Sequence, residues 1–490
     1  MNPTKLLYAH SFALLTDLYQ LTMAYGYWKS ESADKDAVFH LFYRQNPFRG
    51  GYAVAAGLQP IVEVLDGFQF SGDDIEYLRG LTGNDDRPLF DVEFLNYLAD
   101  MEFKCDIDAV PEGTIVFPHE PLVRVAGPII QCQILETFFL NVVNFQTLIA
   151  TRAARICEAA GDDPVLEFGL RRAQGIDGGL AASRAAYIGG CAATSNVLAG
   201  KLYDIPVKGT HAHSWVMSFD DELTAFEAYA DAMPNNCVFL VDTYDTIEGV
   251  KKAIQVGLKL REDGHEMVGI RLDSGDLAWL SIEARRLLDE AGFPDAAVVA
   301  SNDLDENLID NLKHQGTKIN VWGVGTKLVT AFDQPALGGV YKLAAVRGPG
   351  GEWKPKIKLS EQAIKVSNPG IQQVRRFQNK GEFTADVIFD VQIGITDARR
   401  MIDPLDATRQ RSLPMEWEFE DLLVPIFRGG QRVYDPPGIH DVRNRTAAQL
   451  TSCHNGIRRF VNPHQYPVGL EAELHDQKTR LILAARGMQT

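Results

Sequence analysis

Residues 238–277, VFLVDTYDTIEGVKKAIQVGLKLREDGHEMVGIRLDSGDL, contain two apolar runs separated by a helical pattern. The first run ends near Val241, helical spacing follows over 246–260, and the second run ends near Leu272. Strands joined by a helical crossover pair in parallel, whereas antiparallel neighbours need only a tight turn. This stretch therefore predicts one strand–helix–strand unit.

The same alternation extends in both directions along the chain. Further apolar runs end near Phe168, Val207, Ala300 and Trp322, and further helical patterns cover 221–233, 278–291 and 305–315. The polar residues that could bind a ligand follow these strands: Arg171, Thr210 to Ser214, Asp242, Arg271 to Asp276, Asn302 and Thr326. Side chains gathered from so many strand ends favour a closed α/β barrel. An open doubly wound sheet, which would concentrate its ligands at one switch point, remains the alternative.

The length of 490 residues predicts more than one domain. Before the alternating region, the patterns are a helix over 11–28, two strand-like runs over 37–58, helices over 59–104, a small β element over 111–128, and a long apolar helix from Ile129 to about Ala160. We expect an N-terminal α+β domain over 1–150 and an α/β barrel catalytic domain over 151–345. A C-terminal region over 346–490 would pack on both and complete the N-terminal domain.

Composition narrows the class of protein. The net charge of -17 argues against nucleic-acid binding and requires a local basic site for any anionic substrate. The six cysteines form no C-x-x-C pair, which argues against a zinc knuckle or redox pair and suits a reducing cytosol. The N-terminus has no signal-peptide pattern, and no run of consecutive apolar residues is long enough to span a membrane. We therefore expect a cytoplasmic protein without a membrane partner.

The segment GTHAHSW, residues 209–215, places two histidines between hydroxyl side chains at a predicted strand end. Imidazole titrates near neutral pH and can act as a base, an acid, a metal ligand or a nucleophile. An isolated histidine is usually a structural hydrogen-bonding group, but this cluster favours a functional role.

Arginines and carboxylates follow other strands. In EFGLRRAQGIDGGL (167–180), Arg171 and Arg172 precede a Gly-rich turn, where guanidinium groups could bind carboxylate or phosphate; the alternative is a solvated surface pair. In IRLDSGDL (270–277), Arg271 and two aspartates could hold an anionic group and a sugar diol or Mg²⁺, or could form a structural ion-pair network. Asp242 is another carboxylate at a strand end.

A possible phosphate-binding loop comes late in the chain. In VWGVGTK (321–327), Gly325 allows backbone N–H groups to approach a phosphate and Thr326 adds a hydroxyl group, although the spacing is not that of a P-loop. Phosphate often binds at the late loops of α/β barrels. Lys342 in GGVYKL could add a second phosphate contact or be an ordinary strand lysine. Together the motifs suit a phosphorylated sugar, a small anionic partner and Mg²⁺.

Several of these stretches resemble nicotinate phosphoribosyltransferases. The similar segments run in the family's order over most of the chain: TDLYQLTMAYGYW (16–28), FRGGYAVAAGL (48–58), EFGLRRAQGIDGGL (167–180), SNVLAGKLYDIPVKGTHAHSW (195–215), IRLDSGDL (270–277), GVGTK (323–327), GGVYKL (338–343) and NPHQYPVGL (462–470). The resemblance implies a type II phosphoribosyltransferase fold. That fold is an irregular TIM-like α/β barrel beside an α+β domain built from both chain ends, in a homodimer with shared active sites.

The implied reaction joins nicotinate to 5-phosphoribosyl 1-diphosphate in NAD salvage, giving nicotinate mononucleotide and diphosphate. ATP hydrolysis would be coupled to it through a phosphohistidine, and Mg²⁺ would bind mainly through substrate phosphates.

The resemblance also implies roles for individual residues. His213 matches the phosphorylated histidine, and Ser214 beside it is a further substrate-binding candidate. The partner subunit's Tyr19 would stack on the pyridine ring. Thr210, Arg171 and Arg271 match positions around nicotinate, and Asp242, Gly325, Thr326 and Lys342 match positions around the phosphoribosyl and phosphate groups.

Alternative functions make different demands on the sequence. A metal-dependent hydrolase could use the His-x-His pair, but His265 precedes its strand and His314 lies in a helical pattern, so no third histidine is offered. A non-catalytic binding protein should have lost the basic and phosphate-loop residues, which are present. Within the family, the quinolinate enzyme lacks the ATP-linked histidine. Nicotinamide-specific relatives carry an acidic residue at position 211, where this chain has His211, and a protonated imidazole could meet a carboxylate.

Overall fold

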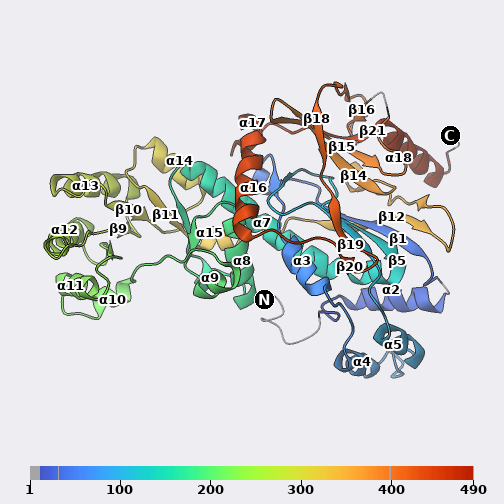
Figure 1. Ribbon diagram of the computed structural model, residues 1–490, viewed down its shortest axis with the longest axis horizontal. Helices are drawn as coiled ribbons and strands as arrows, with labels where there is room; N and C mark the ends of the chain where they lie inside the picture. The colour runs from blue at the N-terminus through green and yellow to red at the C-terminus, as the bar shows by residue number, and fades with distance from the viewer. Residues whose placement is uncertain (1–11, 31, 397–398, 489–490) are drawn as a thin grey trace. The chain divides into compact units, whose positions relative to one another are not determined.

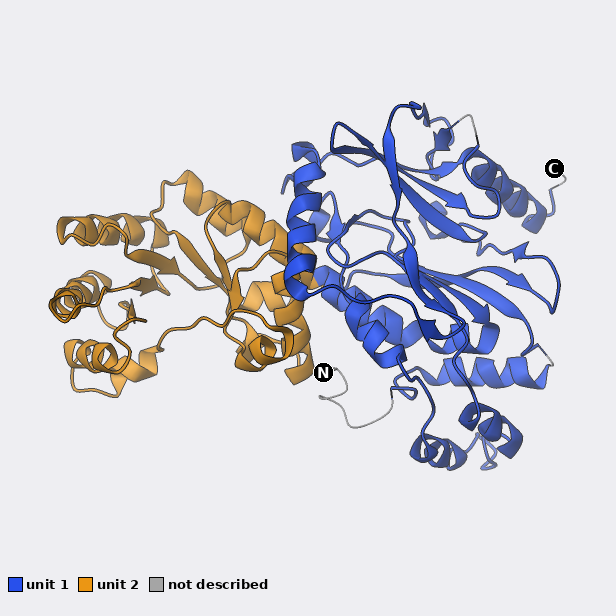
Figure 2. Cartoon of the chain, in the orientation of Figure 1, with its two compact units in different colours: residues 1–148, 336–490 blue, residues 149–335 orange. Residues whose placement is uncertain are grey.

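The computed structural model describes residues 12–30, 32–396 and 399–488. The chain forms two compact units (Figure 2). The first unit combines residues 1–148 with 336–490, and the second is the continuous segment 149–335. The boundary at residue 148 falls inside the helix α7 (Glu136–Ala160).

The second unit, in which Figure 1 labels β9, β10 and β11, contains a parallel sheet of six strands in the order β7-β6-β11-β10-β9-β8. These strands are β6 (Val165–Glu167), β7 (Ala193–Thr194), β8 (Val238–Leu240), β9 (Gly269–Leu272), β10 (Ala297–Ala300) and β11 (Val321–Val324). Every ladder between neighbours is parallel. The strand–helix alternation read from the sequence is therefore confirmed. The two-residue strand β7 was missed because its apolar run is too short to detect.

Helices separate these strands along the chain. They are α8 (Ile176–Ile188), α9 (Val197–Tyr203), α10 (His213–Met217), α11 (Glu222–Ala232), α12 (Thr246–Glu262), α13 (Leu277–Glu290), α14 (Glu306–His314) and α15 (Thr326–Val329). Four begin at an aspartate whose carboxylate accepts a hydrogen bond from a first-turn N–H, namely Asp221, Asp245, Asp276 and Asp305. Asp276, grouped above with the possible ligand-binding residues, thus caps α13.

The parallel sheet has two edges, β7 and β8, and no backbone ladder joins them among the described residues. Beyond β7, the apolar run ending near Val207 forms one isolated parallel bridge from Val207 to Thr194 instead of a strand. The ladders thus form an open sheet, and the predicted closure into a barrel is not made by backbone hydrogen bonds. The segment between Val207 and β8 contains α10 and α11 instead.

The first unit is built around two sheets, of which the larger combines strands from both parts of the chain and the smaller contains strands of the second part alone. The larger has the order β13-β12-β1-β5-β3-β19-β20, with β1 (Asp36–Phe42), β3 (Asp106–Ala109), β5 (Val123–Pro128), β12 (Val340–Arg347), β13 (Lys354–Pro355), β19 (Val424–Arg428) and β20 (Gln431–Arg432). Its interior strand β1 pairs antiparallel with β12 and β5. Buried apolar residues of both chain segments, from Ala13 to Leu474, form one core.

The second sheet of this unit has the order β17-β16-β21-β15-β14-β18. Its strands are β14 (Gln372–Asn379), β15 (Glu382–Asp390), β16 (Arg400–Ile402), β17 (Gln410–Ser412), β18 (Glu418–Asp421) and β21 (Val468–Glu471). The remaining elements are the pair β2 (Ala53–Val54) and β4 (Ile115–Val116), the helices α3 (Leu58–Leu65), α4 (Gly72–Arg79), α5 (Val92–Ala99) and α6 (Ile129–Ile134), and the C-terminal helices α16 (Ile439–Ser452), α17 (Asn455–Arg458) and α18 (Ala472–Ala485).

Two expectations about apolar helices need correction. The helix predicted over 11–28 begins at Leu18 in α2 (Leu18–Lys29), and residue 11 lies outside the described residues. The stretch Ile129–Ala160 is long and apolar enough, by length and composition, to cross a membrane, contrary to the expectation above. Most of its apolar window is buried inside the protein, as in a core helix.

Candidate functional site

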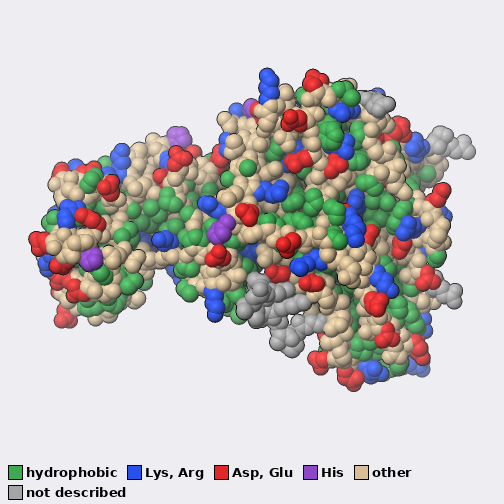
Figure 3. Space-filling model, in the orientation of Figure 1, with side chains coloured by type: hydrophobic (Ala, Val, Ile, Leu, Met, Phe, Trp, Pro, Cys, Tyr) green, Lys and Arg blue, Asp and Glu red, His purple; other side chains and the backbone are tan. Residues whose placement is uncertain are grey.

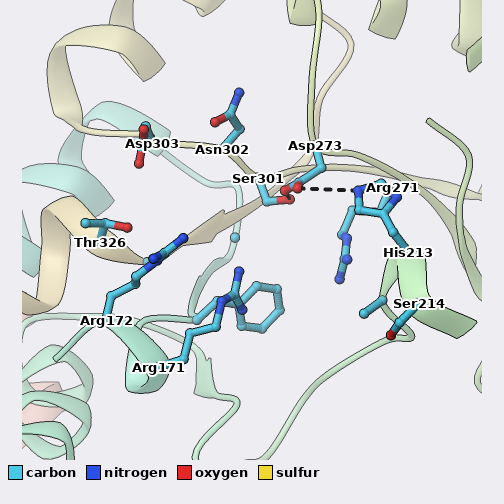
Figure 4. A pocket seen from close by; sticks show the side chains of 14 residues that line it. Arg171, Arg172, His213, Ser214, Arg271, Asp273, Ser301, Asn302, Asp303 and Thr326 are labelled. Carbon is cyan, nitrogen blue, oxygen red and sulfur yellow. Dashed lines mark hydrogen bonds and ion pairs between the residues drawn. The ribbon is translucent and has the colours of Figure 1, made fainter. Parts of the chain in front are cut away.

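A cavity of about 530 Å³ lies at the carboxyl ends of the parallel strands (Figure 4). All of its lining residues belong to the second unit: Phe168, Arg171, Arg172, Ala212, His213, Ser214, Arg271, Asp273, Ser301, Asn302, Asp303, Gly323, Gly325 and Thr326. They come from the ends of β6, β9, β10 and β11 and from the start of α10. Ligands of α/β proteins bind at this edge of a parallel sheet.

Two arginines form one side of the cavity. Arg171 and Arg172 lie in the short helix η2 (Leu170–Arg172) directly after β6, and both side chains are exposed (Figure 4). Glu167, buried at the end of β6, anchors this loop because its carboxylate accepts hydrogen bonds from Gly169 N–H and from the Thr194 hydroxyl at 2.6 Å. The guanidinium groups are thus held beside the cavity while remaining accessible to an anion.

His213 lies on the opposite side of the cavity from the arginine pair (Figure 4). Its Nδ1 is 3.1 Å from the Thr243 hydroxyl, and its Nε2 is 3.9 Å from Asp242 Oδ1 and 3.8 Å from Asp273 Oδ2. The imidazole side chain is 40% exposed. One ring nitrogen is therefore fixed by a hydroxyl group, and the other faces two carboxylates, of which only Asp273 lines the cavity.

Asp242 lies beneath this histidine and does not line the cavity itself. Its side chain is 1% exposed, and Oδ2 accepts hydrogen bonds from Asp273 N–H at 2.8 Å and the Ser274 hydroxyl at 2.6 Å. Oδ1 has no hydrogen-bond partner among the described residues. Asp242 thus orders the loop after β9 and has one oxygen left for a further donor or cation.

Arg271 is held by the segment that precedes His213. Its Nη1 donates to the Thr210 hydroxyl and its Nη2 donates to the His211 carbonyl at 3.1 Å. Burial lowers the pKa of Arg271, and the nearby carboxylates of Asp273 and Asp242 oppose that shift. Thr210 does not line the cavity, but its hydroxyl group helps to orient Arg271, which does.

The loop after β11 supplies a backbone cradle. Gly325 and Thr326 line the cavity, and a Cβ at Gly325 would lie 3.1 Å from the Phe168 carbonyl oxygen, closer than side chains normally pack. Lys327 turns toward Asp305 instead, with Nζ 2.6 Å from Oδ2. This ion pair joins the cradle to the loop after β10.

The loop after β10 has a strained backbone where it lines the cavity. Asn302 and Asp303 have φ angles of 93° and 43°, in the left-handed region that non-glycine residues rarely adopt. Phe168, Ser301 and Asp303 were not identified from the sequence as site residues. The polar run Ser-Asn-Asp directly after the apolar run AVVA was the available signal for two of them.

Two predicted residues lie in the first unit. Tyr19 is on α2 with its side chain partly exposed, and Lys342 is on β12, where its Nζ donates to the Tyr341 carbonyl at 3.0 Å. Burial lowers the pKa of Lys342. The structure thus brings Arg171, His213, Ser214, Arg271, Gly325 and Thr326 together around one cavity, with Thr210 and Asp242 directly behind it.

The two histidines of the His-x-His segment do not point at a common ligand. His211 is buried and its Nε2 accepts a hydrogen bond from Leu240 N–H at 3.2 Å. No cluster of three or more potential metal-binding side chains occurs within residues 12–30, 32–396 and 399–488. The hydrolase alternative loses its support because a backbone donor already occupies the metal-binding nitrogen of His211.

Three family models together match most of the chain. The model of the nicotinate phosphoribosyltransferase N-terminal domain matches residues 14–144, that of the family matches 165–365, and that of the C-terminal domain matches 371–478. The chain belongs to the nicotinate phosphoribosyltransferase family. The family resemblance read from the sequence is therefore confirmed.

Individual relatives agree with this assignment. Nicotinate phosphoribosyltransferase of Bacillus subtilis (strain 168) is 44% identical over 477 residues, which cover 96% of this chain and 95% of that protein. The Homo sapiens nicotinate phosphoribosyltransferase is 35% identical over 518 residues, covering 94% and 95% of the two chains.

Solved structures show the same fold. The crystal structure of human nicotinic acid phosphoribosyltransferase superimposes with a TM-score of 0.83 at 33% identity, covering 95% of this chain and 99% of that one. A nicotinate-nucleotide pyrophosphorylase from Pyrococcus furiosus has a TM-score of 0.69 at 22% identity over 90% of this chain and 96% of that one, which shows a shared fold alone. These likenesses confirm a mixed α/β fold with a parallel sheet.

Proposed function

We propose that this protein is an enzyme that transfers the 5-phosphoribosyl group of 5-phosphoribosyl 1-diphosphate to the ring nitrogen of nicotinate. The products are nicotinate mononucleotide and diphosphate, and the reaction serves NAD salvage. One observation carries the proposal. A single cavity in a chain of this family combines the fixed guanidinium of Arg271, the imidazole of His213 and the backbone cradle at Gly325 and Thr326.

The cavity residues suit the charges that develop in this reaction. The C–O bond to diphosphate breaks and a C–N bond to the pyridine nitrogen forms, so positive charge grows on the sugar and negative charge on the leaving group. Arg171 and Arg271 can bind the planar carboxylate of nicotinate through paired N–H groups. The ring nitrogen needs no strong base, so catalysis depends on orientation and on donors directed at the phosphates.

ATP hydrolysis is coupled to this transfer through His213 in our proposal. The imidazole attacks the γ-phosphorus, the bond to ADP breaks, and water later releases the phosphoryl group from the histidine as phosphate. The accessible position of His213 supports this role, because Thr243 holds Nδ1 while Nε2 faces the cavity. Phosphorylation would add negative charge beside Asp273 and could thereby rearrange the cavity loops.

Mg²⁺ fits the oxygen-rich side of the cavity. Asp273 and Asp303 line it and Asp242 Oδ1 has no hydrogen-bond partner among the described residues, so oxygen donors of the type that Mg²⁺ prefers are present. When bound together with the substrate phosphates, Mg²⁺ would neutralise their negative charge. Most of its ligands would come from the substrate phosphates.

The active enzyme is a cytoplasmic homodimer with shared active sites in this proposal. Tyr19 of the partner subunit would stack on the pyridine ring, and Lys342 would contact phosphate. The partly exposed ring of Tyr19 supports this role, since 49% of the residue is accessible on α2. We further infer that the parallel sheet works as an irregular barrel in which side chains span the opening between β7 and β8.

A product assay tests the proposed function. Purified protein would be supplied with 5-phosphoribosyl 1-diphosphate, Mg²⁺ and either nicotinate or nicotinamide, with and without ATP, beside a His213→Ala variant. We expect nicotinate mononucleotide from nicotinate, with ATP stimulation only when His213 is present. Product from nicotinamide alone would assign the sister activity, and no product from either base would refute the proposal.

A further inference from the structure

The opening between the two edge strands of the parallel sheet is spanned by one side chain. Among the described residues, β7 and β8 share no ladder, yet Leu240 at the end of β8 donates its N–H to His211 Nε2 at 3.2 Å. His211 belongs to the segment that follows the Thr194–Val207 bridge at the other edge. An imidazole therefore takes the place that a backbone carbonyl would occupy in a closed ladder.

The surroundings of His211 fix its protonation state. A backbone N–H can only donate, so Nε2 must carry a lone pair and the ring proton must lie on Nδ1, which is 3.5 Å from the Ala212 carbonyl. The ring packs edge-on against Tyr229 of α11, with centroids 4.8 Å apart, and the residue is 7% exposed. Burial lowers the pKa of His211 to about 4. The imidazole is thus neutral at physiological pH and is directed away from the cavity, which Ala212 and not His211 lines.

The backbone of the same residue acts on the opposite side. The His211 carbonyl accepts a hydrogen bond from Arg271 Nη2 at 3.1 Å, and the neighbouring Thr210 hydroxyl accepts from Nη1. Both acceptors belong to the segment that the imidazole fastens to β8. The orientation of the Arg271 guanidinium at the cavity therefore depends on the hydrogen bond between Leu240 and His211, neither of which lines the cavity.

We infer that His211 is a positioning residue that latches segment 209–213 to β8 through Leu240 N–H and thereby aims Arg271 at an anionic ring substituent. The inference rests on the proposed function for the identity of that substituent. It follows that Arg271, and not the side chain at position 211, selects a pyridine that carries a carboxylate. The sequence left open that a protonated His211 could contact the carboxylate of nicotinate. In the structure His211 instead accepts a hydrogen bond from the backbone N–H of Leu240, which requires a neutral Nε2.

Substitutions at position 211 separate this role from simple packing. His211→Leu keeps an apolar side chain of similar size but leaves Leu240 N–H without an acceptor in a buried place. His211→Gln can restore the hydrogen bond through Oε1 at similar reach. His314→Leu is a matched control because His314 lies on α14 with its side chain 76% exposed. All three variants would be compared with the wild type in steady-state kinetics with each substrate varied in turn.

We expect the KM for nicotinate to rise about tenfold in His211→Leu, with kcat and the KM for 5-phosphoribosyl 1-diphosphate changing less than threefold. His211→Gln should recover most of the nicotinate KM, and His314→Leu should match the wild type. A purely structural role would lower the active fraction, and hence the apparent kcat, without changing either KM. That result, or an unchanged nicotinate KM in His211→Leu, would overturn the inference.

Hydrogen exchange measured by mass spectrometry provides a readout independent of activity. The peptide that contains Leu240 should exchange faster in His211→Leu than in the wild type and in His211→Gln, since its amide loses its acceptor. Equal exchange in all of these proteins would refute the latch. Failure of the wild type to form nicotinate mononucleotide would instead refute the proposed function, and the exchange comparison would still decide whether the latch exists.

Discussion

Replacing Lys327 with methionine should destabilise the second unit and loosen its phosphate cradle. The Lys327 ammonium lies 2.6 Å from Asp305 Oδ2, with 25% and 11% of the two side chains exposed, so the pair is only weakly solvated. Hydrogen bonds between charged groups in such places contribute about 1.5–3 kcal/mol. Asp305 keeps its hydrogen bond from Leu308 N–H at 2.8 Å, and we therefore expect a loss of about 2 kcal/mol in the free energy of unfolding at pH 7.

The pH dependence of this loss follows from the pKa of Asp305. Burial alone would raise that pKa, but the Lys327 ammonium and the Leu308 N–H lower it overall. A depressed carboxyl pKa stabilises the folded state above the unfolded value of about 4, and the stabilisation is lost as the pH falls through the folded value. The difference between wild type and Lys327→Met, measured by urea unfolding, should thus be full at pH 7 and shrink below about pH 4.

A solvated ion pair in the same unit gives the control. Lys251 lies 2.7 Å from Glu248 with both side chains more than half exposed, so Lys251→Met should cost less than about 0.5 kcal/mol. The Lys327 variant should also raise the KM for 5-phosphoribosyl 1-diphosphate, since the adjacent Thr326 lines the cavity. If Lys327→Met is no more destabilising than Lys251→Met, or if its effect persists unchanged at pH 3, the ion pair does not hold the two loops together.

Three other perturbations address the chemistry and the charge balance. His213→Gln should abolish ATP stimulation and labelling by γ-labelled ATP while leaving an ATP-independent rate, and persistent labelling would exclude His213 as the phosphorylated group. Arg271→Lys cannot donate to both Thr210 and the His211 carbonyl in a planar fork, so the nicotinate KM should rise about 10- to 100-fold; an unchanged value would remove Arg271 from the site. Burial lowers the pKa of Lys478 to about 8 in the folded state, whereas an unfolded lysine has a pKa near 10.4. Between these two pH values the unfolded state binds more protons than the folded state. The free energy of unfolding should therefore rise by roughly 2–3 kcal/mol from pH 8 to 10.5. That rise should disappear in Lys478→Met, and a rise of equal size in the variant would show that another group causes it.

The sequence predicted the parallel α/β arrangement because its strands and helices differ clearly in apolar period. Helices α12 and α13, for example, begin within one residue of the expected starts at 246 and 278. The cavity residues His213, Arg271 and Thr326 were found because polar residues directly after buried strands have few other reasons to lie there. Their common location followed from the parallel topology without any knowledge of distances.

Other features depend on tertiary contacts that leave no local signal. Among the described residues no ladder joins β7 and β8, and Leu240 N–H instead donates to a histidine 29 positions away, a contact that no periodicity encodes. The sequence placed Asp242 at a strand end but could not show that its side chain lies behind the cavity lining, where Oδ2 accepts hydrogen bonds from the Asp273 N–H and the Ser274 hydroxyl.

On the face of the molecule in Figure 3, acidic and basic side chains are interspersed. Although the whole chain has a net charge of -17, its acidic side chains do not gather in one region of this face. Because salt screens exposed charges over short distances, the guanidinium groups of Arg171 and Arg172 at the cavity matter more to an anionic substrate than the overall charge does.

The division of the first unit between two distant chain segments has a consequence for synthesis on the ribosome. Strand β1 leaves the exit tunnel early but needs β12, more than 290 residues later, as one of its two neighbours, whereas the second unit is continuous over 149–335. The second unit can therefore fold before β12 is synthesised, while β1 still has one unpaired edge. Nascent chains stalled before β12 should accordingly depend on chaperones that shield β edges, and protease resistance should appear first in the second unit.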